Sequence, residues 1–110
     1  MRSKKLSLTA LLFAAAVIML GAAKSQTFTG EVSDSMCGAK HMMDNKAECT
    51  RTCVSKGSNY ALVVGDKVYT LNTTDKAALD KLNTLAGEQA KVTGTANGDA
   101  IEVSKVSAAK

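Results

Sequence analysis

Residues 59–71 have the sequence NYALVVGDKVYTL, and this stretch decides the fold class that we expect for the chain. Two runs rich in β-branched and aromatic residues, which are typical of strands, stand on either side of Gly65-Asp66. A two-residue connection of the Gly-X type suits a β-hairpin, because its twist matches that of the strands it joins. The stretch therefore predicts two antiparallel strands, at residues 59–64 and 67–71.

Another strand is predicted upstream, at residues 27–33 (TFTGEVS). Phe28, Gly30 and Val32 alternate there with polar residues, which is the period-2 pattern of a strand with one buried face. A glycine inside a strand often marks a bulge or a tight bend. We therefore expect the strand to bulge or to bend sharply at Gly30.

Downstream of the hairpin, the apolar residues take up the spacing of a helix over residues 76–86. A Thr or an Asp just before this segment is suited to cap the N-terminus of the helix, and Gly87 is a natural stop at its C-terminus. The residues expected on the buried face are Ala78, Leu79, Leu82, Leu85 and Ala86.

Two further strands follow the predicted helix. Residues 89–96 (QAKVTGTA) carry small or apolar side chains at alternate positions, and those expected to face inward are Ala90, Val92, Gly94 and Ala96. Asn97-Gly98 is the strongest hairpin signal in the chain. The last strand is marked by Ile101, Val103 and Val106, and residues 107–110 are expected to fray.

The order of these elements predicts a mainly β domain over residues 26–110. Five strands with one helix between the third and the fourth follow the order of an OB-fold, a small partly open barrel. Closing the strands on themselves would remove most exposed edges, which suits a domain with little core. A β-sandwich, or an open sheet with a packed helix, is the alternative architecture.

The N-terminus predicts a secretory signal peptide over residues 1–25. Arg2, Lys4 and Lys5 form a positive segment, residues 6–20 (LSLTALLFAAAVIML) form the apolar segment, and cleavage is expected after Ala23 or Ser25. The alternative is a permanent membrane anchor, but the apolar run falls short of the roughly 20 residues that span a bilayer. We expect a periplasmic or secreted protein with no membrane span after cleavage.

The net charge of +4 comes from this N-terminal segment. Four of the 14 basic residues lie in the first 24 residues, which contain no acidic residue, so ten basic residues remain against ten acidic ones. A nucleic-acid-binding protein needs a basic face that neutralises phosphates. We therefore expect no nucleic-acid partner.

The chemistry is concentrated in residues 34–57, an insertion between the first two strands that we expect to be partly helical. It holds the three cysteines and the only histidine of the chain, in the pattern Cys37-x3-His41-x7-Cys49-x3-Cys53. Each pair separated by four residues would share one face if its segment were helical. Three thiolates and one imidazole predict a Cys3His site for Zn²⁺, and thioether sulfur from neighbouring methionines makes Cu⁺ a second candidate.

Two alternatives compete with the metal site. Exported proteins usually oxidise cysteine pairs, so Cys37 joined to Cys49 or to Cys53 would leave one thiol over. Such a disulfide would stabilise a mature domain of about 85 residues, a size at which an apolar core alone is marginal. The third hypothesis is a thiol redox protein that uses Cys37, with His41 lowering the pKa of its thiol.

The sequence also resembles a known family. The run GEVSDSMCG at residues 30–38, the segments ECT and CV around Cys49 and Cys53, GSNYAL at residues 57–62 and KVTGT at residues 91–95 are similar to a family of small secreted bacterial proteins. That family is a domain of unknown function with a predicted OB-like barrel. The resemblance covers about residues 28–106 and implies secretion and a barrel, while it implies no activity.

These observations together predict an exported, non-enzymatic binding protein. We expect Zn²⁺ or Cu⁺ as its ligand and Cys37, His41, Cys49 and Cys53 as the ligating residues. A disulfide-stabilised interaction module of the cell envelope, without a metal, is the alternative. The partner would be an envelope protein or a small ligand, and the protein is expected to be a monomer.

Overall fold

The computed structural model describes residues 24–40 and 44–109. The described chain is mainly β, with five strands and two helices, as the sequence predicts. Nearly all of the predicted signal peptide, together with His41, lies outside the described residues. Within them, no helix is long and apolar enough to cross a membrane. The elements are β1 (Gln26–Asp34), α2 (Lys46–Ser55), β2 (Tyr60–Val64), β3 (Lys67–Asn72), α3 (Lys76–Thr84), β4 (Gln89–Asn97) and β5 (Ala100–Ala108).

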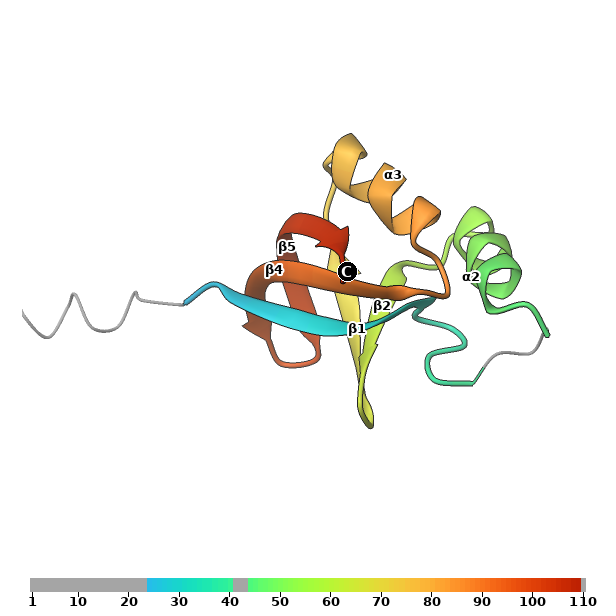
Figure 1. Cartoon of the computed structure of the whole chain (residues 1–110), viewed down its shortest axis with the longest axis horizontal. Coiled ribbons are helices and arrows are strands. Elements are labelled where there is room, and N and C mark those ends of the chain that lie inside the picture. The colour runs from blue at the N-terminus through green and yellow to red at the C-terminus, as the bar shows by residue number, and fades with distance from the viewer. Residues whose placement is uncertain (1–23, 41–43, 110) are drawn as a thin grey trace, which may run out of the picture.

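The five strands form one closed sheet in the order β1-β2-β3-β5-β4, with β4 returning to β1 (Figure 1). β3 and β5 are parallel, and every other neighbouring pair is antiparallel. β1 serves two partners, since its first half pairs with β4 and its second half with β2. The backbone partners of Glu31 are therefore both Val63 and Gln89. Closure removes most of the open strand edges.

Gly30 marks the point where β1 changes partner. A Cβ at this position would lie 2.2 Å from the carbonyl oxygen of Val63, which is an impossible contact. Only glycine allows β1 and β2 to approach this closely. Gly30 thus permits the close crossing at which β1 passes from β4 to β2, while the strand registers run through it without a bulge.

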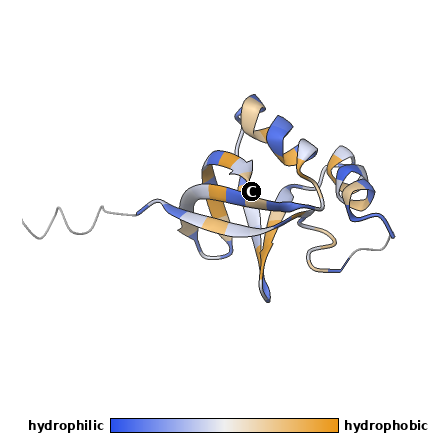
Figure 2. Ribbon diagram, in the orientation of Figure 1, coloured by the Kyte–Doolittle hydropathy of each residue, from blue (hydrophilic) through white to orange (hydrophobic). Residues whose placement is uncertain are grey.

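The interior of the closed sheet holds the apolar core. Figure 2 shows orange, hydrophobic segments alternating along the strands with hydrophilic ones, as expected when one face of each strand points inward. The fully or nearly fully buried members of the core are Val32, Tyr60, Leu62, Leu71, Ala78, Leu82, Ala90, Val92, Ile101 and Val106. The strand and helix patterns in the sequence therefore identify this core outside the β2–β3 hairpin, where the sequence assigned no buried face.

Helix α3 covers one end of the core between β3 and β4 (Figure 1). Its N-cap is Asp75, whose side chain accepts a hydrogen bond from the Ala78 amide, which confirms the predicted cap. Ala78 and Leu82 are buried, but Leu79 is 36% exposed, so the predicted buried face was too wide. The helix also ends at Thr84, two residues before the predicted end.

The last hairpin differs from the prediction in three respects. The two-residue loop is Gly98-Asp99, because Asn97 still pairs with Ala100. Ala96 is exposed, since it lies beyond Gly94, where the pairing of β4 with β1 ends among the described residues. β5 continues to Ala108 instead of fraying from residue 107, because its end pairs with the start of β4.

A bulge in β5 explains the spacing of its apolar residues. Thr93 pairs with Lys105 and Gly94 with Val103, so Ser104 has no opposite residue. One extra residue shifts the side-chain alternation by one position. Ile101 and Val106 are consequently both buried, although they are five residues apart.

Candidate metal centre

Helix α2 carries two of the three cysteines and is the helical part of the predicted insertion. Its N-cap is Asn45, whose side-chain oxygen accepts a hydrogen bond from the Glu48 amide at 3.1 Å. Lys46 forms an ion pair with Glu31 of β1 at 3.1 Å. At the other side, Arg51 donates two hydrogen bonds, of 3.0 and 2.9 Å, to the carbonyl oxygen of Asn83 in the last turn of helix α3. These contacts fix the helix beside the sheet.

The third cysteine, Cys37, lies in a tight turn at residues 35–39 that leaves the end of β1. One carboxylate oxygen of Asp34, Oδ2, accepts hydrogen bonds from the Met36 and Cys37 amides, both at 3.0 Å. The Ser33 hydroxyl donates to the Gly38 carbonyl oxygen at 2.7 Å. Gly38 has φ +58°, a left-handed conformation that favours glycine. The turn is therefore anchored by polar contacts.

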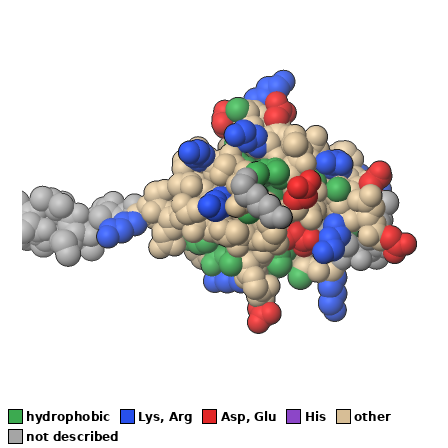
Figure 3. All heavy atoms as spheres, in the orientation of Figure 1, with side chains coloured by type: hydrophobic (Ala, Val, Ile, Leu, Met, Phe, Trp, Pro, Cys, Tyr) green, Lys and Arg blue, Asp and Glu red, His purple; other side chains and the backbone are tan. Residues whose placement is uncertain are grey.

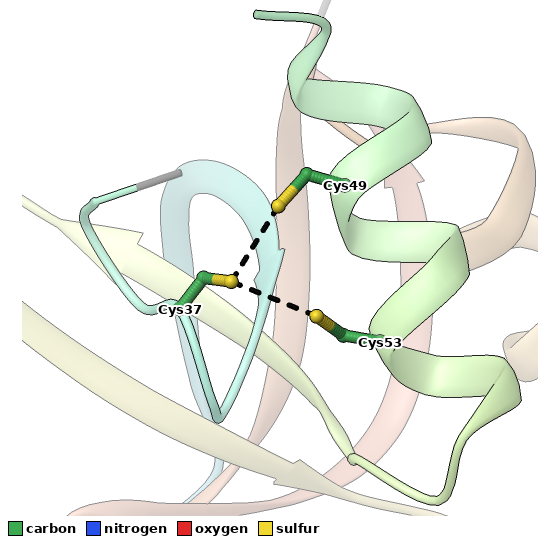
Figure 4. Close-up of side chains that lie close together, drawn as sticks. All are labelled: Cys37, Cys49 and Cys53. Carbon is green, nitrogen blue, oxygen red and sulfur yellow. Dashed lines mark hydrogen bonds between the residues drawn. The ribbon is translucent and has the colours of Figure 1, made fainter. Parts of the chain in front are cut away.

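The two segments bring the three sulfur atoms together. Cys49 and Cys53, four residues apart on α2, point from the same side of the helix toward Cys37 (Figure 4). The Cys37 sulfur lies 3.5 Å from that of Cys49 and 3.6 Å from that of Cys53. All three sulfurs lie within 4.8 Å of one another. Cys49 is buried, whereas Cys37 and Cys53 are partly exposed.

These separations are those of thiols around a common point. A disulfide requires a sulfur–sulfur distance of about 2.05 Å, and none of the three pairs lies at that distance. The predicted disulfide is thus not formed, and Cys37 instead lies almost equally far from two sulfurs. Sulfurs bound to one tetrahedral Zn²⁺ at about 2.3 Å would be about 3.8 Å apart. The cluster needs little adjustment to hold one ion.

The structure tests only part of the predicted Cys3His set. The three cysteines are brought together, whereas His41 falls outside the described residues. Residues 35–39 form turns, so Cys37 does not lie on a helical face as one of the predicted pairs required. Met36 is 75% exposed, and its thioether does not pack against the domain. The described donors are therefore three thiols.

The electrostatics favour the protonated form of two of these thiols, Cys37 and Cys53, when no cation is present. The pKa of Cys37 is raised from 9.0 to about 12, chiefly by its hydrogen bond to Cys49 and then by burial, with a smaller effect of the Asp34 charge. For Cys53, the hydrogen bond from Cys37 lowers the pKa, but burial and Asp34 outweigh it and the net pKa is raised. A reactive thiol requires a lowered pKa, so these shifts disfavour Cys37 as a redox nucleophile.

The cysteine and histidine pattern identifies neither Ser33 nor Asp34 as part of the site. Both side chains are fully buried and both shape the turn that carries Cys37. The signal was present, because a Ser-Asp pair at the end of a strand often bonds to the backbone of a following turn. The other carboxylate oxygen of Asp34, Oδ1, is buried without a hydrogen-bond partner among the described residues.

The charged side chains on the face drawn in Figure 3 are of mixed sign. Figure 3 shows lysine and arginine interspersed with aspartate and glutamate over the face in view.

Comparison of the chain with protein-family models, with curated proteins and with solved structures gives no match. The chemistry of the protein must therefore be argued from its own geometry, and the sulfur cluster is the feature that offers it.

Proposed function

We propose that this chain is a non-enzymatic binding protein for one thiophilic transition-metal ion, Zn²⁺ or Cu⁺. Cys37, Cys49 and Cys53 are the ligands that we assign, with His41 as the fourth ligand that the sequence pattern suggests. The observation that carries the proposal is the approach of three sulfurs, from two separate segments, to within 4.8 Å of one another. The soft thiolate is the ligand that such ions prefer.

The way in which the sulfurs are held supports a binding site. Hydrogen bonds between thiols are weak and give little reason to gather three cysteines. Here α2 is tied to β1 and to α3, and the Cys37 turn is tied to Asp34, so that both supports are fixed before any ligand arrives. Preorganised donors cost less conformational entropy when they close on an ion.

The number of donors separates the two metals. Three sulfurs and the His41 imidazole would complete the tetrahedral Cys3His set of a structural zinc site. Three sulfurs alone would suit Cu⁺, because this ion is held by thiolates with a low coordination number. Replacing His41 by alanine therefore distinguishes the two, since Zn²⁺ binding would weaken and Cu⁺ binding would not.

We further infer that the closed sheet is an OB-like barrel and that the protein is exported as a monomer. The strand order β1-β2-β3-β5-β4, with α3 between β3 and β4, supports the barrel. The positive and apolar segments of residues 1–25 support export. An envelope protein that delivers or receives the ion is the partner that we expect.

The direct test is metal binding by the full-length protein, expressed with its signal and purified from the exported fraction under reducing, anaerobic conditions. We expect one Co²⁺ per chain, with the near-ultraviolet charge-transfer absorption of cobalt–thiolate bonds, and displacement of Co²⁺ by Zn²⁺. Changing Cys37, Cys49 or Cys53 singly to serine should remove most of this absorption. Met36→Ala is the matched control, because its exposed side chain adjoins Cys37 without facing the cluster.

The envelope module without a metal makes a different prediction. Protein taken from the periplasm, alkylated without reduction and weighed by mass spectrometry, would then show one disulfide and one alkylated thiol. We expect instead three alkylated thiols after chelation and one bound ion before it. A disulfide with no bound ion in freshly exported protein would overturn the metal proposal.

A further inference from the structure

Asp34 is a buried carboxylate with no compensating charge in the described part of the chain. Its side chain has no exposed surface. The ion pairs of the described residues join Lys46 to Glu31 and Lys67 to Asp99. A buried charge normally has an ionic partner or a complete set of hydrogen bonds, because the loss of hydration is otherwise uncompensated. This carboxylate has donors for only one of its two oxygens.

The two oxygens of Asp34 have different surroundings. Oδ2 accepts the Met36 and Cys37 amides and lies 3.5 Å from the Ser58 hydroxyl. Oδ1 has no hydrogen-bond partner among the described residues. The carboxyl group nevertheless adjoins the sulfur cluster, since its Oδ2 is hydrogen-bonded at 3.0 Å to the backbone of Cys37, whose sulfur is a member of the cluster. The carboxylate with the unpartnered oxygen is therefore a neighbour of the candidate metal centre.

A negative charge at this position is unfavourable next to thiolates and favourable next to a cation. Each thiol that ionises for a metal adds a further negative charge near Asp34, and like charges at short range destabilise each other. A bound cation reverses the sign of the interaction. By Coulomb's law the attraction of one carboxylate for an ion is twice as large for a charge of +2 as for +1.

We propose that Asp34 sets the charge preference of the cysteine site, so that the site favours a divalent ion such as Zn²⁺ over a monovalent ion such as Cu⁺. This inference rests on the proposed function and specifies it. The same side chain positions Cys37 through its backbone amide. Asp34 thus has two separable roles, one that depends on its charge and one that depends on its hydrogen bonds.

Asp34→Asn separates these roles. The amide oxygen of asparagine can replace Oδ2 as acceptor of the Met36 and Cys37 amides, so the turn keeps its anchor. The negative charge is lost at the position where Oδ1 had no partner. The easier ionisation of the cysteines in this variant helps both metals alike, and it cancels in the ratio of their affinities.

The experiment measures the affinities of the full-length protein for Zn²⁺ and Cu⁺ by competition with chromophoric chelators. For Asp34→Asn we expect the ratio of Zn²⁺ affinity to Cu⁺ affinity to fall by about tenfold or more, in line with the Coulomb energies of short charge pairs. Ser33→Ala is the control for anchoring, because it removes the bond to the Gly38 carbonyl without changing charge. It should weaken both metals by the same factor.

Two further variants complete the test. Asp66→Asn removes a charge from the exposed β2–β3 turn and should leave the ratio unchanged. Ser58→Lys places a cation beside Asp34 from a half-buried position in a loop. It should lower the ratio of Zn²⁺ affinity to Cu⁺ affinity, as Asp34→Asn should, and it provides the test if Asp34→Asn does not fold. Asp34→Asn and Ser58→Lys both act on the charge of Asp34. If the ratio of Zn²⁺ affinity to Cu⁺ affinity is unchanged in whichever of them folds, the charge role of Asp34 is overturned. Failure of the unmodified protein to bind either ion would instead overturn the proposed function.

Discussion

The closed sheet and the cysteine insertion are stabilised by different kinds of interaction. The sheet encloses an apolar core that includes Leu62, Leu82 and Ile101, all without exposed surface. Helix α2 fully buries only Cys49 and Thr50. Apart from the half-buried Val54, which packs against the core, polar contacts hold it in place, namely an ion pair and an arginine bridge. Apolar burial supplies most of the stability of a small domain, whereas single polar contacts supply little. The sheet should therefore supply most of the stability of the metal-free domain, and a bound ion should add stability mainly to the insertion.

The largest effect should come from breaking the core. Leu62→Ala removes a fully buried side chain from β2, and such changes typically cost about 2–5 kcal/mol because a cavity remains. We expect the free energy of unfolding in urea to fall by this amount in metal-free and metal-bound protein alike. Leu79→Ala, at a partly exposed position of α3, is the control and should cost far less. Equal losses in the two variants would contradict the assigned core.

Removing the metal should affect the other region. An ion present at about a thousand times its dissociation constant stabilises the folded state by about 4 kcal/mol, and its contacts here lie in the insertion. Hydrogen exchange should therefore become faster in α2 after chelation, while the amides of β4 and β5 keep their protection. Uniform loss of protection across both regions would show that the sheet and the insertion unfold as one unit.

The acid–base behaviour of Cys37 sharpens the same comparison. Its pKa in the folded, metal-free protein is about 12 against an ordinary 9.0, so the folded state holds the thiol proton more tightly than the unfolded state does. The stability that this contributes is fully present below pH 9 and is lost as the pH rises toward 12. We expect the unfolding free energy of metal-free protein to decline over this interval, with a smaller decline in Cys37→Ser.

Metal-bound protein should respond to pH in the opposite sense. Thiolates, and not thiols, are the ligands, so binding releases protons and becomes stronger as the pH rises. Titration of Zn²⁺ affinity should show this increase in the unmodified protein. A pH-independent affinity would mean that the cysteines are not the ligands.

The hairpin of β2 and β3 and the helix α3 could be predicted because their signals are local. Gly65-Asp66 and the Asp75 cap act on residues within one turn of themselves. The bulge at Ser104 and the exposure of Ala96 could not be predicted, because both depend on where neighbouring strands start and end. Local alternation carries no information about those ends.

The same distinction applies to the candidate site. The spacing of Cys49 and Cys53 predicts that they share a helical face, and they do. The position of Cys37 beside both of them depends on the pairing of β1 with β2, on the docking of α2 and on the hydrogen bonds of Asp34. These contacts join residues far apart in sequence or form only when the chain is folded. The sequence spacing therefore identified the three cysteines of the cluster. It did not predict the sulfur–sulfur distances, which are too long for a disulfide.

The smallest expected effect compares the two helix caps. Asn45→Ala removes the N-cap of α2 and Asp75→Ala removes that of α3, and each loss costs about 1 kcal/mol. Because α3 packs on the core through Ala78 and Leu82, Asp75→Ala should lower the urea midpoint of the whole domain. Asn45→Ala should leave that midpoint nearly unchanged in metal-free protein and weaken Zn²⁺ binding several-fold, since the ion must then order the start of the helix that carries Cys49. The reverse outcome would be that Asn45→Ala lowers the urea midpoint and leaves the Zn²⁺ affinity unchanged. It would mean that α2 unfolds together with the sheet, and that the sulfur cluster is not a separately stabilised binding site.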